Sequence, residues 1–216
     1  MSRLGHATKR ARGRKEAARA MNAAYPIAEA APHVYHALVW RLGRGSASVL
    51  DIGTGVMASV DDLSPAVKIG LDAHRPYLEN RRSRAAVPLH ADALALGDLF
   101  VPGAVDLVTL LDVIEHFTPE DAAALLGQAE QVAAKRVVIS TPRGEFPQEG
   151  YDAYGLGGEE LQRHRSTWQP EDFTARGYQV VVLRGLHGPE NESFVEAFGP
   201  DAPPVDGLVA WKDTAA

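Results

Sequence analysis

Two carboxylates and an imidazole lie within five residues, at Asp112, Glu115 and His116, and a second histidine, His164, follows a long polar stretch. An unperturbed histidine titrates at about pH 6.5, so it can take a proton from a phenol, an enol or an amine near neutral pH. We therefore predict that Glu115, His116 and His164 are catalytic. A structural role for either histidine, in orienting its loop, is the alternative that the sequence leaves open.

A second group of chemically suitable residues lies in SVLDIGTG at 48–55, where an apolar run ends in Asp51, Gly53 and Gly55. Glycine tolerates positive φ and has no Cβ that would keep a small molecule away from the main chain. The stretch predicts a buried strand and then a tight turn whose backbone touches a nucleotide-like ligand.

The elements that position these residues follow from apolar runs along the chain. Runs suitable for strands lie at 48–52, 67–71, 87–89, 105–111, 136–140, 178–184 and 207–212, and helix-compatible segments at 14–21, 32–42, 75–84, 119–134 and 168–176. This order predicts an α/β fold, a Rossmann-like seven-stranded sheet that is mostly parallel, ends in an antiparallel hairpin and is flanked by helices. Asp72 and Asp92 follow the second and third strands. They should therefore lie at the ligand-binding edge, beside the glycine turn.

Gly53 to Ala58 formally matches the G-x-G-x-x-A fingerprint, so a nicotinamide-dinucleotide-dependent oxidoreductase is one alternative. Asp51, two residues before the first glycine, would repel a pyrophosphate and suits a ligand with an ammonium or sulfonium group. The segment 56–65 contains two acids and a proline. It does not favour the helix whose N-terminus would bind a phosphate.

Taken together, DIGTG at 51–55, Asp72, HAD at 90–92 and LDVIEHF at 111–117 resemble the class I S-adenosylmethionine-dependent methyltransferases. The resemblance covers residues 48–212. Within that superfamily, the residues from 112 to 178 are similar to a poorly characterised bacterial and archaeal group of type-11-like methyltransferases. The resemblance implies the class I methyltransferase fold, an enzyme, and S-adenosyl-L-methionine as cofactor.

The resemblance also implies roles for single residues. Gly53 and Gly55 would line the methionine part of the cofactor, with Asp51 near its amino group. Asp72 would accept the ribose hydroxyls, as an acid does at this place in dinucleotide enzymes. Asp92 would bind the adenine amine, with Ala93 beside the ring. Leu111 and Asp112 would lie near the transferable methyl group. Met57 departs from the superfamily, which often has a third glycine there.

Residues 143–167 show no hydrophobic period, which predicts a functional loop. The predicted acceptor-binding residues are Arg143, Phe146, Gln148, Tyr151 and Trp168. Methyl transfer from a sulfonium depends mainly on placing the acceptor atom in line with the methyl group. The predicted function is transfer of a methyl group to an O or N atom of a small-molecule acceptor, and a non-catalytic cofactor-binding protein is a further alternative.

A metal-assisted alternative comes from the same residues. Asp112, Glu115, His116 and His164 resemble the metal-binding set of the small-RNA 3′-end 2′-O-methyltransferases, although that family has glutamate where this chain has Asp112. Mixed oxygen and nitrogen ligands would suit Mn²⁺. We nevertheless predict no metal ligand, and a nucleic-acid partner is the less favoured possibility, because the body of the chain is acidic and no RNA-binding domain is recognisable.

Composition bounds the remaining possibilities. With 216 residues, 45% of them hydrophobic, the chain can bury one sizeable core. We divide it into 1–45, a basic leader with helices that could cap the ligand site, and 46–216, the cofactor-binding domain. Residues 1–20 hold seven basic side chains and one acid, which leaves 15 basic and 27 acidic side chains in the rest. No apolar run approaches the ~20 residues of a membrane span, so we expect a soluble, cytoplasmic protein. The absence of cysteine excludes disulfides and thiolate sites.

Overall fold

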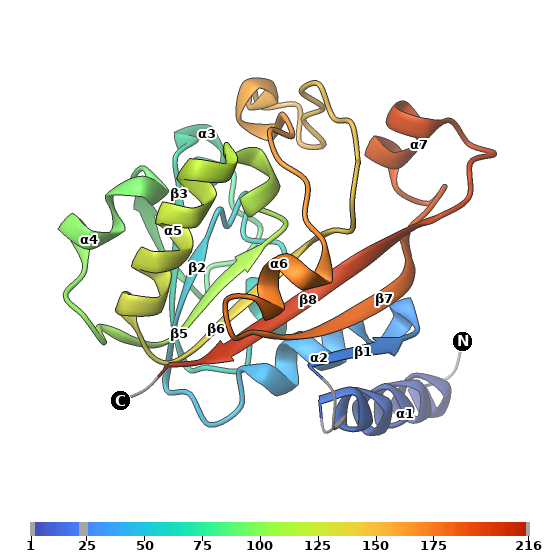
Figure 1. Cartoon of the computed structure of the whole chain (residues 1–216). Coiled ribbons are helices and arrows are strands. Elements are labelled where there is room, and N and C mark those ends of the chain that lie inside the picture. The colour runs from blue at the N-terminus through green and yellow to red at the C-terminus, as the bar shows by residue number, and fades with distance from the viewer. Residues whose placement is uncertain (1–2, 22–25, 215–216) are drawn as a thin grey trace.

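In the computed structural model, which describes residues 3–21 and 26–214, one sheet has the strand order β1-β7-β8-β6-β5-β2-β3-β4 (Figure 1). Its strands are β1 (Ile27–Ala30), β2 (Ser48–Ile52), β3 (Val67–Asp72), β4 (Val87–His90), β5 (Val105–Leu111), β6 (Ala133–Pro142), β7 (Gln179–His187) and β8 (Val205–Asp213). β8 runs antiparallel to β6 and β7, and the other neighbours are parallel. The predicted α/β fold, a mostly parallel sheet with an antiparallel hairpin, is confirmed.

The sheet has eight strands, so the prediction of seven was wrong. The additional strand is β1, which pairs in parallel with β7 and places Ile27 opposite Val180. Its sequence, IAEA, is too short to show an alternating hydrophobic pattern. The N-terminal segment therefore supplies one edge of the sheet.

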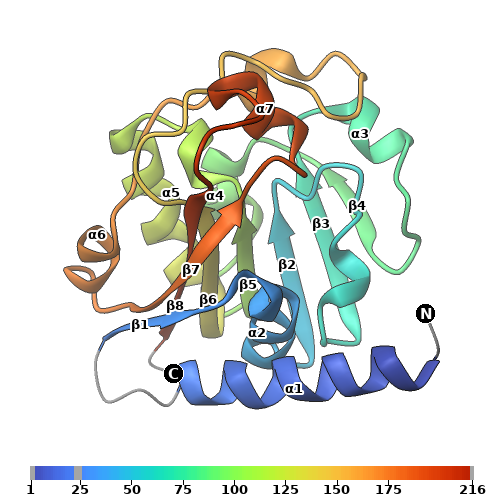
Figure 2. The ribbon, with the colours of Figure 1, turned by 90° about the vertical axis from the view of Figure 1, so that its right-hand side faces the viewer.

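Helices cover both faces of the sheet (Figure 2). They are α1 (Arg3–Met21), α2 (Tyr35–Leu42), α3 (Arg75–Glu79), α4 (Leu96–Leu99), α5 (Pro119–Val132), α6 (Pro170–Thr174) and α7 (Glu192–Phe198). Successive strand residues face opposite sides of a sheet. Accordingly Val49 packs in one buried cluster with Leu38 of α2, whereas Leu50 packs in another with Leu125 of α5.

Several helix boundaries differ from the prediction. α1 begins at Arg3 rather than at residue 14, and its Ala17 is fully buried, so the C-terminal part of this helix packs against the rest of the protein. α3 ends at Glu79 rather than at 84. α7 lies outside the segments predicted to be helical, and the Asn191 side chain caps it by accepting a hydrogen bond from the Ser193 amide at 3.0 Å. Of the predicted units 1–45 and 46–216, residues 1–2, 22–25 and 215–216 lie outside the described residues.

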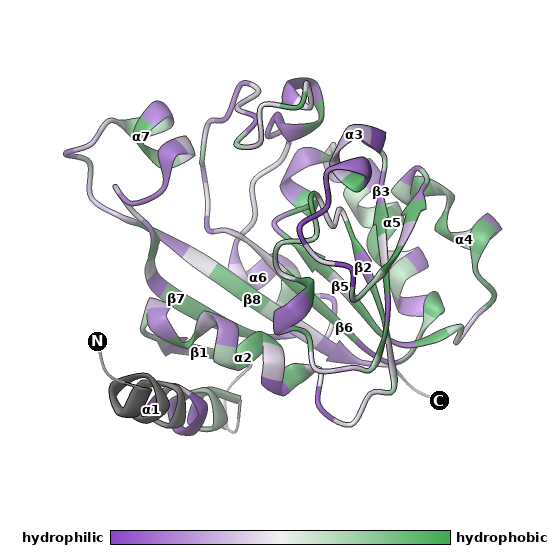
Figure 3. Ribbon diagram, turned by 180° about the vertical axis from the view of Figure 1, so that it is seen from behind, coloured by the Kyte–Doolittle hydropathy of each residue, from purple (hydrophilic) through white to green (hydrophobic). Residues whose placement is uncertain are grey.

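Hydrophobic residues concentrate in the central strands β5, β6 and β8, and polar residues in the segments around them (Figure 3). Over residues 3–21 and 26–214, we find no helix that combines the length and the apolar character needed to cross a membrane.

We predict that the N-terminal helices share the cooperative unfolding of the sheet. Leu38 on α2 is fully buried, so Leu38→Ala should lower the free energy of unfolding by about 2–5 kcal/mol. Leu99 on α4 is 45% exposed, and Leu99→Ala, the matched control, should change it by less than about 0.5 kcal/mol. Urea denaturation followed by circular dichroism measures both. A second, separate transition in Leu38→Ala would contradict the prediction.

Candidate functional site

The carboxyl ends of β2, β3, β4 and β5 surround a cavity of about 480 Å³. The chain from 160 to 165 closes one side of it, so part of the long loop after β6 forms a wall. The described residues that line the cavity run from Gly53 to Arg165. This is the edge of the sheet at which ligands bind in open α/β folds.

The glycine turn is held from below by the carboxyl group of Asp51, which is 2% exposed. Asp51 accepts hydrogen bonds from the hydroxyls of Thr54 at 2.8 Å and Thr109 at 2.6 Å. These two hydrogen bonds connect the glycine turn to β5, so the carboxyl group positions the backbone of the turn. Burial raises its pKa to about 6.

Gly53 and Gly55 both have positive φ, 62° and 55°. A Cβ on Gly53 would lie 2.6 Å from the side chain of Val113, so this position admits only glycine. A Cβ on Gly55 would lie 3.4 Å from the ring of Tyr154, in the long loop. Met57, at φ 57°, takes the left-handed conformation that glycine favours, and its fully buried side chain joins a small core beside Gly70. Apolar packing thus accompanies a conformation that is costly for methionine.

The two predicted nucleoside-binding acids both line the cavity. Asp72 accepts backbone hydrogen bonds from Gly55 at 2.7 Å and from His74 at 2.8 Å. Burial raises its pKa. Asp92 accepts a hydrogen bond from the Leu94 amide at 2.9 Å, and Ala93 lines the cavity next to it. The structure therefore brings together Asp72, Asp92 and the glycine turn.

Asp112 also lines the cavity, whereas Leu111 packs on the α2 side of the sheet. Asp112 has φ 55°, and its carboxylate accepts a hydrogen bond from Ser140 Oγ at 3.1 Å. Ser140 is in turn 3.0 Å from the hydroxyl of Tyr35, at the start of α2. Tyr35 thus connects the N-terminal segment to the floor of the site.

The three predicted catalytic residues are close together. Potential ligand atoms of Glu115, His116 and His164 all lie within 4.8 Å of one another, and the two imidazole ring centroids are 5.0 Å apart. The backbone holds this arrangement, because the Glu115 carbonyl accepts hydrogen bonds from the amides of Arg165 at 2.7 Å and Ser166 at 3.1 Å. The long loop is thereby tied to the end of β5.

Each imidazole uses one nitrogen for a backbone carbonyl. His116 Nδ1 lies 3.3 Å from the Arg163 oxygen, and His164 Nδ1 lies 2.7 Å from the Phe146 oxygen. Since a carbonyl only accepts, both Nδ1 atoms carry the proton, and in the neutral ring both Nε2 atoms have a free lone pair. Such a pair of nitrogens can take a proton or hold a metal ion.

Burial sets the charge of this cluster. It lowers the pKa of His116 to about 4, with His164 as the second cause, and it also lowers the pKa of His164. Both imidazoles are therefore neutral at pH 7. The pKa of Glu115, which is 2% exposed, is raised by burial and then by Asp112. Thr141 Oγ1 donates a hydrogen bond to this carboxyl group at 3.0 Å.

Two of the five predicted acceptor-binding residues line a second cavity, and the other three are described by their contacts within the protein. Gln148 and Tyr151 line a second cavity, of about 400 Å³, and Phe146 packs edge-on near His164. Trp168 is 6% exposed and packs on Phe173, with its indole N–H donating to Ser166 Oγ at 3.0 Å.

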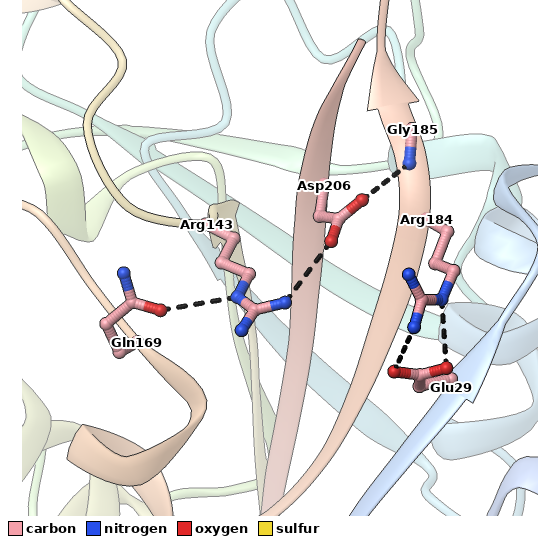
Figure 4. A network of polar contacts seen from close by, with 6 residues as sticks. All are labelled: Glu29, Arg143, Gln169, Arg184, Gly185 and Asp206. Atoms are coloured by element: carbon pink, nitrogen blue, oxygen red, sulfur yellow. Dashed lines mark hydrogen bonds and ion pairs between the residues drawn. The ribbon is translucent and has the colours of Figure 1, made fainter. Parts of the chain in front are cut away.

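Arg143 belongs to a polar network on the hairpin (Figure 4). Its guanidinium donates to Asp206 Oδ2 at 3.3 Å and to Gln169 Oε1 at 3.2 Å. Asp206 also accepts from the Gly185 amide at 2.9 Å. The structure thus places Arg143 between β8 and the start of α6.

Sequence reasoning did not find two groups that shape the site. Asp152 accepts hydrogen bonds from the Tyr77 hydroxyl and from the amides of Tyr154, Leu156 and Gly158, which folds the long loop onto α3. His187, at the end of β7, packs against Phe146 with a centroid distance of 5.6 Å. Neither residue stands in a motif, and only the tertiary structure brings them to the site.

No protein-family model and no curated protein sequence matches the chain. Among solved structures, it is similar to a SAM-dependent methyltransferase from Archaeoglobus fulgidus, with 17% identity and a TM-score of 0.54 over 84% of this chain and 95% of that one. It is also similar to the methyltransferase domain of bacterial CtHen1-C, with 18% identity and a TM-score of 0.52 over 83% and 95%. The plantazolicin methyltransferase BamL, solved with SAH, has 14% identity and a TM-score of 0.53 over 81% and 79%. The chain therefore has the class I methyltransferase fold.

We predict that the Asp51 carboxyl group makes folding stability depend on pH. Its folded pKa of about 6 exceeds the ordinary value of 3.8, so between these pH values the unfolded chain loses a proton that the folded chain keeps. The wild type should therefore lose roughly 2–3 kcal/mol relative to Asp51→Asn as the pH rises from about 4 to about 6. Urea denaturation of both proteins across this range measures the difference. Parallel stability curves would contradict it.

Proposed function

We propose that this protein transfers a methyl group from S-adenosyl-L-methionine to an oxygen or nitrogen atom of a small-molecule acceptor. One observation carries the proposal: Gly53 of the glycine turn, Asp72, Asp92 and His116 line one cavity at the carboxyl ends of the parallel strands. A nucleoside-binding wall and a proton-accepting group thus meet in one space.

The donor set fits the cofactor. An ionised carboxylate has about four lone-pair positions, so Asp72 can accept both ribose hydroxyls in addition to its two backbone N–H groups. Asp92 would bind the adenine amine, with Ala93 and Leu94 against the ring. Val113 lies so close to Gly53 that this position cannot carry a side chain. The bare backbone would then lie against the methionine part of the cofactor.

The cofactor supplies an already activated methyl group, so this chain has to orient the acceptor and remove its proton. His116 lines the cavity beside Asp112, and its neutral Nε2 can take that proton directly. His164 and Glu115 lie next to it and would orient the acceptor or relay the proton. The buried environment keeps both imidazoles neutral, so their Nε2 lone pairs are available, and it makes both of them weaker bases than a solvated histidine.

The geometry gives less support to the nicotinamide alternative. Between β2 and β3 the chain forms one short 3₁₀ helix (Val60–Asp62) and no α-helix begins among these described residues. A pyrophosphate would therefore lack the helix N-terminus that normally binds it. The open cavity also argues against a non-catalytic protein whose pocket is filled by side chains.

A metal-assisted reaction is the second candidate, although we predicted no metal ligand from the sequence. The observation that favours it is the cluster of Glu115, His116 and His164, in which both Nε2 atoms are free and both Nδ1 atoms bind carbonyls. A backbone carbonyl that accepts a hydrogen bond from Nδ1 orients the ring of a histidine that binds a metal ion through Nε2. An RNA acceptor is less supported, because the basic helix α1 lies at the end of the sheet opposite the long loop and α3 (Figures 1 and 2).

We predict that S-adenosylhomocysteine binds the wild type and that Asp72→Ala weakens this binding about tenfold to a hundredfold, because two hydrogen bonds to a charged group are lost. Isothermal titration calorimetry measures the affinity. The control is Asp98→Ala, which removes an exposed carboxylate on α4 and should leave the affinity unchanged. Absence of binding to the wild type, or tighter binding of NADH, would overturn the proposed function.

We predict for the metal candidate that Mn²⁺ raises the thermal unfolding midpoint of the wild type, because a ligand that binds the folded state stabilises it. His116→Ala and His164→Ala should abolish the increase. His36→Ala is the control, since His36 lies on α2 with a side chain that is 71% exposed. A wild-type midpoint that does not respond to Mn²⁺ would remove the metal-assisted candidate and leave the proton-accepting role of the histidines.

A further inference from the structure

Residues 150–159 of the long loop form a compact segment whose two ends meet. A Cβ on Gly150 would lie 2.9 Å from the carbonyl oxygen of Glu159, so the chain leaves and returns at one place. Near this closure the Tyr151 hydroxyl donates a hydrogen bond to Glu192 of α7. Shortly after it, Gln162 lines both the cavity at the strand ends, the first cavity, and the second cavity. Compact loops with close ends are frequently functional, and we call residues 150–159 the omega loop.

The carboxylate of Asp152 holds the omega loop together from within. Its Oδ1 accepts a hydrogen bond from the Tyr154 amide at 2.9 Å, and its Oδ2 accepts from the amides of Leu156 at 2.7 Å and Gly158 at 3.1 Å. Burial acts to raise the pKa of this carboxyl group, but its hydrogen bonds outweigh burial and lower the pKa to about 2. The group is therefore ionised at neutral pH. Because these three hydrogen bonds lie inside the loop, the loop can move as one unit.

Two hydrogen bonds connect the omega loop to the beginning of α3. The Tyr77 hydroxyl donates to Asp152 Oδ1 at 2.8 Å, and His74 Nε2 lies 2.8 Å from the carbonyl oxygen of Leu156. Gly158 packs against the same tyrosine so closely that a Cβ would lie 2.0 Å from its hydroxyl oxygen. Figure 2 shows the long loop beside α3, at the end of the sheet toward which β2 and β3 point.

The omega loop lies over residues that we assign to the cofactor. The ring of Tyr154, which is 37% exposed, comes within 3.4 Å of the Cβ position of Gly55. Tyr77 is 1% exposed and lines the first cavity, and its ring centroid is 5.2 Å from that of Tyr154. The amides of Gly55 and His74 both donate to the carboxylate of Asp72. The proposed ribose-binding group is thus bonded to the glycine turn under the loop and to the residue that contacts the loop.

We propose that the omega loop is a lid of the donor site, and that Tyr77 and Asp152 are positioning residues that hold it closed. The inference rests on the proposed function. In the closed position Tyr154 forms the outer wall of the glycine turn, against the methionine part of the cofactor. A ribose bound to Asp72 stabilises this position, because Asp72 fixes the backbone of His74, which contacts the loop.

Opening the lid breaks few interactions. The two hydrogen bonds to α3 and the edge-to-face contact between Tyr77 and Tyr154 are lost, while the hydrogen bonds inside the loop remain. Segments with few attachments open locally at a fraction of the free energy of global unfolding. Gly150, at φ 119°, is the flexible residue at the base of the loop. Since the lid must open before the cofactor leaves, the hydrogen bond between Tyr77 and Asp152 controls the rate of release.

The test measures the association and dissociation rate constants of S-adenosylhomocysteine on the full-length protein by surface plasmon resonance. Tyr77→Phe removes one hydrogen bond to an ionised acceptor, so we expect the dissociation rate constant to rise about tenfold and the association rate constant to change less than about twofold. Asp152→Asn, which keeps the size of the side chain and removes its charge, should change both in the same direction. The matched control is Tyr178→Phe, whose lost hydroxyl donates to Glu130 at 2.9 Å. Neither Tyr178 nor Glu130 lines the first cavity, so both rate constants should stay unchanged.

Hydrogen–deuterium exchange gives a readout that a purely structural role would not change. Saturating S-adenosylhomocysteine should slow the exchange of the amides of Tyr154, Leu156 and Gly158 in the wild type, and should slow it much less in Tyr77→Phe. If S-adenosylhomocysteine binds but leaves this exchange unchanged, or leaves Tyr77→Phe at the wild-type rate of release, the lid is overturned and the proposed function stands. If S-adenosylhomocysteine does not bind the wild type, the proposed function is overturned and the lid with it.

Discussion

The buried carboxyl group of Asp51 is the interaction on which the geometry of the site depends. It accepts hydrogen bonds from the hydroxyls of Thr54 in the glycine turn and Thr109 on β5, so it joins the ends of two neighbouring strands. Through this junction the turn is set against Val113 at a distance that only glycine allows. The carboxyl group is costly to bury, and the two hydroxyls compensate for part of that cost. Asp51 is not itself among the described residues that line the cavity, so it positions the cavity wall through the backbone of the glycine turn.

Sequence reasoning predicted the parts of the molecule that have a strong period or a local signal. The apolar strands and the helix at 119–134 follow from such signals, and α5 is found at Pro119–Val132. β1 and α7 were not predicted. The four residues of β1 are too few to show a hydrophobic period, and the Asn191 cap of α7 lies among loop-like residues. Their stability comes from pairing with β7 and from tertiary packing, neither of which a local pattern reports.

Within the site, the residues at strand ends could be predicted, because parallel topology alone brings Asp72, Asp92 and Asp112 to one edge. The proximity of His164 to His116 depends instead on backbone hydrogen bonds between the long loop and the Glu115 carbonyl. No pattern in the sequence of the long loop indicates which of its residues lie beside the end of β5. Arg143, placed by the sequence in the acceptor pocket, is held by Asp206 and Gln169 in the structure, and whether it also contacts the acceptor stays a prediction.

The shared position of Gln162 has a thermodynamic consequence. The segment around Gln162 lines both cavities, and the Gln162 carbonyl accepts a hydrogen bond from Gln148 Nε2. Any ordering of that wall by an occupant of one cavity changes the conformational entropy that the other occupant must lose. By linkage the effect is reciprocal: the factor by which an occupant of the first cavity alters the affinity of the second cavity equals the factor by which an occupant of the second alters the affinity of the first. The segment around Gln162 therefore couples the two cavities. Its flexibility sets how strongly the two binding equilibria depend on each other.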